Sequence, residues 1–303
     1  MASQDRFHSL DAVAELRSVT RSYGRITALQ GIDLELRRGE LMALLGPNGA
    51  GKSSAIALWL GLAEPDSGEA RLLGGSPLAV DRRRGVGVMM QDVGLVNGLK
   101  VRELIEQTAS YYPDPMSVDE ALEITHIKAL AQRYYDKLSG GQKRQVQFAL
   151  AICGRPPVLF LDEPSVGMDV AARAILWAAI RRLRDGGCSI LLTTHYLEEA
   201  EILADRVVVL SKGRIVASGT VGEVRALVSR RHIRCDSTLS TAELADWPGV
   251  VCVSRSEQRL TILATDAEGV LRRLLARDQA VANIEVQQAG LAEAFIELTK
   301  EAA

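Results

Sequence analysis

The strongest constraint on the fold of this chain is the sequence LMALLGPNGAGKSSAIALWLGL at residues 41–62. Its first five residues are all apolar and predict a short strand that is buried on both faces, and the glycine that follows ends it. From Lys52 onward the apolar residues recur at helical spacing. A buried strand joined directly to a helix by a glycine-rich loop predicts an α/β fold, in which helices cover both faces of a parallel sheet.

The same alternation of strands and helices recurs along most of the chain. Two segments near the amino end alternate apolar and polar residues, as half-buried strands do. The later sequence RVVVLSKGRIVASG predicts a hairpin that turns at Lys212-Gly213. Strands are predicted at residues 12–20, 31–40, 41–46, 68–78, 85–92, 157–164 and 189–195, and helices at 52–62, 169–185 and 196–204.

Two parts depart from this alternation, and they suggest the domain organisation. The first is helical in period and predicts a helical subdomain at about residues 92–157, within a first domain of residues 13–225. Ser117 and Glu120 predict a capping box there. The second part, residues 226–303, has the order strand, helix, strand, strand, helix, strand, helix, which predicts a small split βαβ-like α+β accessory domain. The helices predicted in the subdomain are 100–112, 117–135 and 140–153.

The composition predicts a polypeptide that is soluble by itself. Hydrophobic residues make up 47% and charged residues 24%, and the formal net charge of −2 provides no overall basic field for nucleic acid. No apolar run approaches the ~20 residues of a membrane-spanning helix, and the amino end lacks the pattern of a signal peptide. Four scattered cysteines without a CxxC pair predict reduced thiols in a cytosolic protein and no zinc site: Cys153, Cys188, Cys235 and Cys252. A membrane role then requires a partner.

The glycine-rich loop GPNGAGKS, residues 46–53, fits the pattern G-x-x-x-x-G-K-[ST] of phosphate-binding loops. Its glycines allow successive backbone N–H groups to point at the β- and γ-phosphates of a nucleotide, and Lys52 neutralises their charge. The hydroxyl of Ser53 is placed to bind Mg²⁺. The predicted strand before the loop and the helix after it are the context in which this pattern binds nucleotide.

Polar residues follow three of the other predicted strands. Asp162 and Glu163 come after VLFL, His195 after SILLTT, and Gln91 after GVGVMM. Because ligands bind at the carboxyl ends of the strands in open α/β sheets, these side chains belong to a candidate site. Asp162 suits Mg²⁺ held through water, and Glu163 suits the polarisation of an attacking water. His195 suits a contact with the γ-phosphate, and Gln91 the orientation of water or Mg²⁺. Taken singly, each is also compatible with a structural role.

A second glycine-rich sequence, KLSGGQKRQVQFAL at residues 137–150, begins another predicted helix. Ser139 and two glycines precede Lys143 and Arg144 in its first turn. This combination suits an anion, because a helix start offers free N–H groups and the positive end of the helix dipole. The chain therefore contains a second predicted phosphate site in addition to the one at residues 46–53.

With these motifs in this order, residues 13–225 resemble the ATPase subunit of an ATP-binding cassette (ABC) transporter. Ser54 stands where threonine is commoner in that family, and Met168 where leucine is usual, but neither change removes a functional group that the family needs. The segments that carry the resemblance are RSYGR with Tyr23, GPNGAGKSS, Gln91, LSGGQ at 138–142, VLFLDEP, SVGMD at 165–169 and TTHYLEEAE at 193–201.

The resemblance implies a P-loop ABC ATPase fold, with a mixed, largely parallel core sheet, an antiparallel β-subdomain and a helical subdomain. It implies ATP and Mg²⁺ as ligands, catalytic roles for Glu163, His195 and Gln91, and metal binding by Ser53, Gln91 and Asp162. It also implies that two cassettes close head to tail around two Mg·ATP. The residues implied to bind nucleotide are Tyr23, which stacks on adenine, Gly46, Pro47, Asn48, Gly49, Ala50, Gly51, Lys52, Ser53, Ser54, Ser139, Gly140, Gly141, Gln142 and Asp169.

Within the family, the sequences SVGMDVAAR, TTHYLEEAEILADRVVVLSKGRIVASGT and GLAEAFIELT resemble the exporter branch. That branch implies a separate six-helix membrane permease as partner, a second ATPase subunit, with a homodimer expected, and a cytoplasmic location on the inner face of the membrane. Importers share much of the same core. A soluble ABC ATPase acting on nucleic acid or ribosomes is the alternative, but no tandem cassette, coiled coil or zinc module is visible. A P-loop kinase or GTPase is disfavoured by LSGGQ and by the lack of an NKxD motif.

Overall fold

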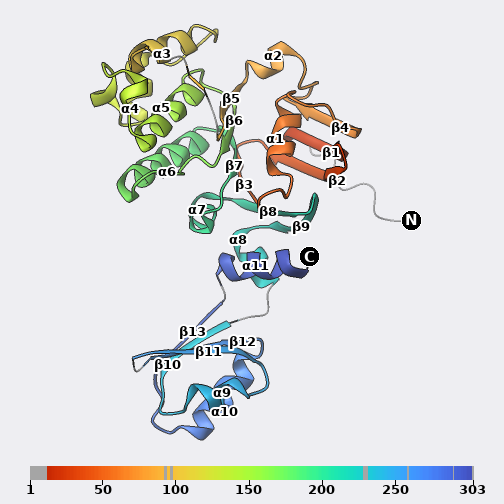
Figure 1. The fold of residues 1–303 in the computed structure, drawn as a ribbon, viewed down its shortest axis with the longest axis vertical. Helices are drawn as coiled ribbons and strands as arrows, with labels where there is room; N and C mark the ends of the chain where they lie inside the picture. Colours follow the sequence, from red (N-terminus) through yellow and green to blue (C-terminus); the bar gives the residue numbers. More distant parts are fainter. Residues whose placement is uncertain are drawn as a thin grey trace. The chain divides into compact units, whose positions relative to one another are not determined.

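The computed structural model of the chain describes residues 12–91, 94–95, 98–227, 231–257, 259–288 and 290–301. The chain forms two compact units that divide between Thr220 and Val221 (Figure 1). Helix α8 (Val221–Ala226) packs against α11 (Leu291–Glu301) within the second unit. The sequence predicts the domain boundary after residue 225, and the observed division lies one helix earlier.

The first unit is built around a six-stranded sheet with the strand order β5-β6-β7-β3-β8-β9. All neighbouring strands are parallel except β8 and β9, which form an antiparallel hairpin. Lys212 and Gly213 turn this hairpin with φ angles of 47° and 74°, the left-handed conformation that a tight two-residue turn requires. The predicted parallel sheet and hairpin are confirmed. The strands are β3 Leu41–Leu45, β5 Val86–Met89, β6 Val158–Asp162, β7 Ser189–Thr193, β8 Arg206–Ser211 and β9 Arg214–Gly219.

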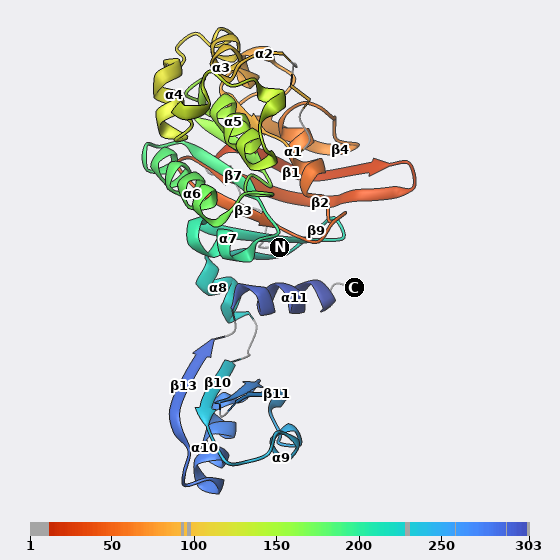
Figure 2. The same ribbon diagram turned by 60° about the vertical axis from the view of Figure 1, so that its left-hand side comes forward.

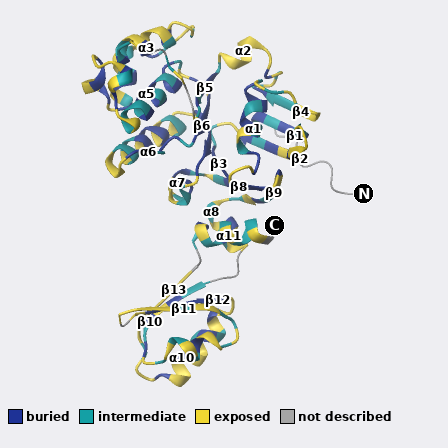
Figure 3. Cartoon of the chain, in the orientation of Figure 1, coloured by how far each residue is buried: buried dark blue, intermediate teal, exposed yellow. Residues whose placement is uncertain are grey.

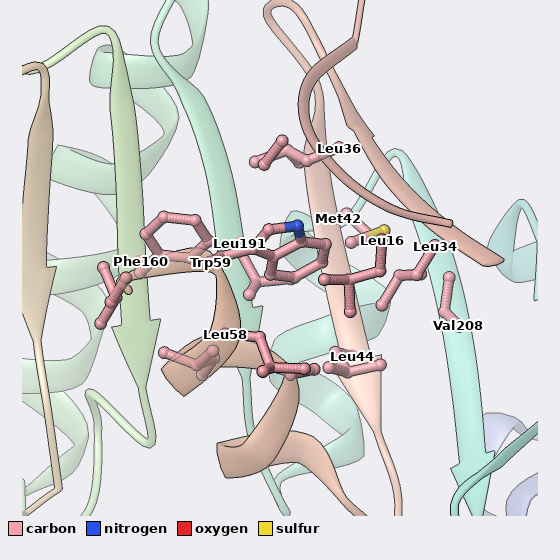
Figure 4. Close-up of a cluster of buried hydrophobic side chains, with 14 of the residues drawn as sticks. Leu16, Leu34, Leu36, Met42, Leu44, Leu58, Trp59, Phe160, Leu191 and Val208 are labelled. Carbon is pink, nitrogen blue, oxygen red and sulfur yellow. The ribbon is translucent and has the colours of Figure 1, made fainter. Parts of the chain in front are cut away.

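An antiparallel sheet of order β2-β1-β4 forms the amino-terminal part of this unit (Figure 2). Its strands, β1 (Ala12–Tyr23), β2 (Ile26–Arg37) and β4 (Ser67–Leu72), share one hydrophobic core with helix α1 (Lys52–Trp59) and one face of the central sheet. The ring of Trp59 in α1 stacks on Phe160 of β6 with a centroid distance of 5.8 Å (Figure 4). This contact fixes the helix that follows the glycine-rich loop to a central strand.

The central strands are buried on both faces (Figure 3). Successive side chains of a strand point to opposite faces, so each strand contributes to two cores. Phe160 joins the core that contains α1, whereas Leu159 and Leu161 join a second core with α5 (Gly140–Ile152) and α6 (Val170–Asp185). Burial on both sides explains why these strands are continuous apolar runs in the sequence.

The helical subdomain has a core of its own, formed chiefly by α3 (Val101–Ala109), α4 (Val118–Ile124) and α5. Helix α5 belongs to two cores at once. Its residues Val146 and Ala149, with Cys153 just beyond its end, face the subdomain, and Phe148, Ala151 and Ile152 face the central sheet. The remaining helices of the first unit are α2 (Val80–Arg83) and α7 (Leu197–Leu203).

Two predictions in the subdomain need correction. The helix expected over residues 117–135 ends at Ile124, because His126 adopts a left-handed φ of 54°, and short 3₁₀ turns follow at Lys128–Leu130 and Tyr135–Lys137. The expected capping box is half formed. Ser117 Oγ accepts a hydrogen bond from the N–H of Glu120 (3.1 Å), but the Glu120 carboxylate pairs with Arg155 at 2.5 Å instead.

The second unit contains an antiparallel four-stranded sheet of order β11-β12-β10-β13, with α9 and α10 packed on a shared core. Its element order confirms the predicted split βαβ pattern. Asp278, after α10, accepts hydrogen bonds from Ser237 Oγ and from the N–H of Thr238, which hold its pKa at about 2. The elements are β10 Arg231–Asp236, α9 Thr241–Ala245, β11 Val250–Ser256, β12 Arg259–Ala264, α10 Ala267–Arg277 and β13 Ala282–Gln288.

All four cysteines are free thiols. Cys153, Cys188 and Cys235 are buried, and burial raises the pKa of Cys153 to about 11 and that of Cys188 to about 12. Within the described ranges, no helix is both long enough and apolar enough to cross a membrane.

Replacing Trp59, which is completely buried, tests the importance of its packing. We expect Trp59→Ala to lower the free energy of unfolding by about 3–5 kcal/mol, because it removes the stacking on Phe160 and leaves a cavity. Urea titration followed by far-ultraviolet circular dichroism measures the change. Leu62→Ala is the control and should stay within about 0.5 kcal/mol, because Leu62 is largely exposed. Equal effects of the two variants would contradict this account of the core.

Candidate functional site

The glycine-rich loop joins β3 to α1 and passes close to neighbouring backbone. A Cβ atom on Gly46 would lie 2.4 Å from the carbonyl oxygen of Leu210. Gly51 has a φ of 110°, and a Cβ there would lie 2.5 Å from the carbonyl oxygen of Ala28. Only glycine therefore fits the space at both positions, and at Gly51 the backbone conformation also requires it.

The start of α1 presents donors to the loop. The N–H of Ala55 makes a helical bond to the carbonyl of Gly51 (3.0 Å), so the N–H groups of the preceding helical residues have no acceptor within the helix. Lys52 Nζ donates to the carbonyl oxygens of Gly46 (2.6 Å) and Pro47 (3.2 Å). Burial lowers the pKa of Lys52, while the carboxylates of Glu163 and Asp162 act to raise it. The loop thus combines a helix start with a cationic side chain, as an anion site requires.

A cleft of about 780 Å³ brings most of the predicted site residues together. The carboxyl ends of β3, β6 and β7 contribute to it because these strands run parallel in one sheet. Gly46 and Pro47 do not line the cleft but bind Lys52 through their carbonyl groups. The lining residues are Tyr23, Ile26, Ala28, Asn48, Gly49, Ala50, Gly51, Lys52, Ser53, Ser54, Gln91, Asp162, Glu163 and His195.

Glu163 and His195 are in direct contact in this cleft. Glu163 Oε2 lies 2.5 Å from His195 Nδ1, and the backbone N–H of His195 also donates to Oε2 (3.3 Å). The Glu163 carboxylate is mostly buried, whereas the imidazole is exposed. A carboxylate held against an imidazole at the mouth of a phosphate-binding loop can orient a water molecule and accept its proton.

Thr193, which the sequence analysis did not single out, organises the acidic pair. Its hydroxyl donates to the Asp162 carboxylate, and its carbonyl oxygen accepts the N–H of Glu163 (3.1 Å). Glu163 has a φ of 52°, an uncommon left-handed conformation for a residue with a side chain. The only signal in the sequence was the position of Thr193 two residues before His195, which by itself does not reveal this contact.

Tyr23 lies at the edge of the cleft and is 47% exposed. The guanidinium of Arg21 lies 4.8 Å from the centre of its ring. The exposed Ile26 lines the same part of the cleft. An accessible aromatic ring beside an apolar side chain is suited to stacking against a planar base.

The second glycine-rich sequence, LSGGQ at residues 138–142, lies at the start of α5 and not in this cleft. Ser139 caps α5, where Ser139 Oγ accepts from the N–H of Gln142 (3.3 Å) and Gln142 Oε1 accepts from the N–H of Ser139 (3.2 Å). Asp169 caps α6 by accepting from the N–H of Ala172 (2.8 Å). As far as the structure describes the chain, neither Asp169 nor any of the residues 139–142 lines the cleft. The predicted site residues therefore form two separate groups.

The donor atoms of the cleft suit a hard divalent cation. Ser53, Gln91 and Asp162 offer a hydroxyl, an amide and a carboxylate oxygen, the ligand type that Mg²⁺ prefers. No group of three or more His, Cys, Asp or Glu side chains with metal-binding spacing occurs within the described part of the chain. The oxygen set matches a cation that also binds phosphate oxygens and water rather than a closed protein cage.

Comparisons with known proteins agree with this geometry. The family described as ABC transporter matches residues 29–166. The daunorubicin resistance ATP-binding protein DrrA3 of Streptomyces coeruleorubidus is 32% identical over 305 residues, which cover 95% of this chain and 96% of that protein. The Nod factor export ATP-binding protein I of Paraburkholderia xenovorans (strain LB400) is 38% identical, with 75% of each chain covered.

Solved structures show the same likeness. An ATP-binding subunit of an ABC transporter superposes with a TM-score of 0.65 at 28% identity, covering 71% of this chain and 92% of that one. A bacterial ABC transporter cassette solved as a dimer gives a TM-score of 0.62 at 25% identity, covering 68% and 98%. The chain thus belongs to the ATP-binding subunits of ABC transporters, which are ATPases that couple hydrolysis to transport.

Proposed function

We propose that this chain powers export through a separate membrane permease of the six-helix type, on the inner, cytoplasmic face of the membrane. Relatives that match it are named for Nod factor export and for resistance to daunorubicin. The linearmycin resistance ATP-binding protein LnrL of Bacillus subtilis (strain 168) is 30% identical, with 94% of this chain and 97% of that protein covered. Residues 13–225 would form the nucleotide-binding domain and 226–303 the accessory domain.

The observation that carries the mechanism is the separation of the motif residues into two groups. The cleft holds the phosphate loop with Glu163 and His195, while the LSGGQ residues lie at the start of α5 outside it. A second copy of the chain, placed head to tail, would bring its own LSGGQ to this cleft. Each of the two ATP sites would then combine the phosphate loop of one chain with the LSGGQ of the other. This explains why one chain has two phosphate-binding sequences.

In each site, the N–H groups of the loop and Lys52 bind the β- and γ-phosphates. Tyr23 stacks on the adenine, a contact worth on the order of 1 kcal/mol. Ser53 and Asp162, with Gln91, hold Mg²⁺, which when bound neutralises charge that develops on the phosphates. From the partner, Ser139, the N–H groups of the two glycines, Gln142 and Asp169 would complete the nucleotide site, with Ser139 and the glycine N–H groups on the γ-phosphate.

Glu163 would orient and polarise the attacking water, with His195 holding its carboxylate and contacting the γ-phosphate. Phosphoryl transfer depends mainly on positioning and charge neutralisation, and the short contact between Glu163 and His195 supplies the positioning. ATP would favour the closed dimer because the γ-phosphate is bound fully only there, and hydrolysis would remove that preference. Closing and opening would in turn drive the permease between its two states.

Glu163→Gln keeps the shape of the side chain and removes its basicity. Turnover should fall by about 10²–10⁴-fold while ATP binding persists and a closed dimer accumulates. Phosphate release and gel filtration with ATP measure both effects. Glu198→Gln, on the exposed face of α7, is the matched control and should behave like the original protein. Equal turnover of Glu163→Gln and the original chain would disprove the catalytic assignment.

Lys52→Ala removes the cation of the phosphate loop. We expect loss of nucleotide binding or of turnover, because the phosphate charge is no longer neutralised. Equilibrium dialysis with labelled ATP and phosphate release measure these. Lys128→Ala, which removes an exposed lysine paired with Glu123, serves as the control. Unchanged ATPase activity in Lys52→Ala would refute the assignment of the loop.

Ser139→Arg tests the contribution of one chain to the site of the other. Turnover should disappear because the large cation blocks approach to the partner, while ATP binding to the single chain should remain largely intact. Ser240→Arg is a matched control, since Ser240 caps α9 through the same kind of bond to Glu243 (3.2 Å). Loss of such a cap typically lowers the free energy of unfolding by ~1 kcal/mol. Turnover of the Ser240→Arg control shows how much a lost helix cap by itself affects activity. Normal turnover in Ser139→Arg would exclude the head-to-tail arrangement.

A further inference from the structure

Arg144 lies on α5, five residues after Ser139. The sequence predicts that it belongs to the anion site at the helix start, but this is wrong: Arg144 is only 8% exposed and its guanidinium bonds to backbone groups inside the protein. Nη1 donates to the carbonyl oxygens of Met90 (2.9 Å) and Gln91 (3.2 Å), and Nη2 donates to that of Glu163 (2.9 Å). A buried cation with several backbone acceptors is positioned far more tightly than a surface arginine.

These three carbonyl groups follow two neighbouring strands. Met90 and Gln91 come after β5, Glu163 comes after β6, and β5 and β6 pair in parallel. The single guanidinium therefore ties together the two backbone segments that carry Gln91 and Glu163 into the cleft. Both side chains are lining residues of the nucleotide cleft, although Arg144 itself is not.

The backbone of Glu163 is held from both sides. Its N–H donates to the carbonyl oxygen and to the hydroxyl of Thr193, and its own carbonyl oxygen accepts from Arg144. A left-handed φ of 52° persists in a residue with a side chain only when its surroundings maintain it. Arg144 is thus one of the groups that keep the Glu163 carboxylate aimed at His195.

The same guanidinium is linked to the segment that precedes LSGGQ. Gln147, one helical turn beyond Arg144, accepts from Nη1 through Oε1 (3.1 Å). Its Nε2 donates to the hydroxyl of Tyr135 (3.0 Å), a buried residue four positions before Ser139. Arg144 is therefore linked on one side to the segment before LSGGQ, which would bind the partner's ATP, and on the other to Gln91 and Glu163, which act on the ATP of its own chain.

We propose that Arg144 is a positioning residue that couples the two half-sites of one chain. It holds Gln91 and Glu163 in their places for the ATP bound by its own chain, from a helix whose start contacts the ATP of the partner. A displacement of α5 when LSGGQ meets the partner's nucleotide would shift Arg144 and, through it, the backbone of Glu163. This inference rests on the head-to-tail dimer of the proposed function.

The test uses the full chain and compares Arg144→Met, Arg144→Lys and the control Arg255→Met. Arg255 also donates to two backbone carbonyl oxygens, those of Ser237 and Leu239, but in the second unit. Arg144→Met should lower kcat by about 10²-fold, the size expected for a small misplacement of a catalytic group. Its Kd for ATP should stay within about twofold, since Arg144 lines no part of the cleft. Arg144→Lys keeps the charge but not the several donors of the guanidinium, so its kcat should lie between those of Arg144→Met and the original chain.

A double variant separates positioning from general stability. Because Arg144 acts largely through Glu163, most of its effect should vanish once Glu163 is replaced. In long single-turnover measurements, Glu163→Gln/Arg144→Met should turn over within about 10-fold of Glu163→Gln alone, and the remaining loss reflects Gln91. A further drop of more than about 10-fold in the double variant, or an unchanged kcat in Arg144→Met, would overturn the inference. So would a loss of ATP affinity as large as the loss of kcat.

These outcomes are distinguishable from a failure of the proposed function. Normal turnover in Glu163→Gln would contradict the catalytic site itself. Normal turnover in Arg144→Met alongside an inactive Glu163→Gln would contradict only the positioning role. If Arg144→Met does not fold, Arg144→Lys decides alone: the original kcat in Arg144→Lys overturns the inference, and a lowered kcat with unchanged Kd supports it.

Discussion

Parallel pairing of β3 with β7, and of β7 with β6, places the carboxyl ends of three buried strands side by side. The phosphate loop follows β3, the acidic pair lies at the end of β6, and His195 follows β7. Because each strand is buried on both faces, its register cannot slip by one residue without turning every side chain to the wrong core. The relative positions of Lys52, Glu163 and His195 therefore depend on the apolar packing of the strands that precede them.

The polar groups at this edge depend on one another. Asp162 and Thr193 are almost fully buried, and buried polar groups are tolerated only when they are hydrogen-bonded. The Thr193 hydroxyl bonds to Asp162, and its carbonyl bonds to Glu163. Lys52 supplies the positive charge that faces both carboxylates. Such a network is stable only as a whole, because removal of one member leaves a buried partner unsatisfied.

Local patterns were sufficient to predict the parts of the fold that depend on local chemistry. The apolar runs predicted the strands β3, β6 and β7, and the glycine pattern predicted the loop at residues 46–53. The helix over 117–135 was predicted too long, because nothing in the local period reveals that His126 turns left-handed. The partner of Glu120 is Arg155, and that of Asp162 is Thr193, both about thirty residues away. Contacts of this kind arise from tertiary packing, and single-sequence periodicity carries no information about them.

Helix α5 is enclosed between the core of the helical subdomain and the core of the central sheet, with different side chains committed to each. Its 13 residues span about 20 Å at the rise of an α-helix. A helix packed on both sides resists bending, since bending it would open a gap in one core or the other. A rotation that begins at its amino end would then be delivered undiminished to the far end, next to Cys153. The helical subdomain and the central sheet therefore share this helix, so a displacement of one has to be accommodated in the packing of the other.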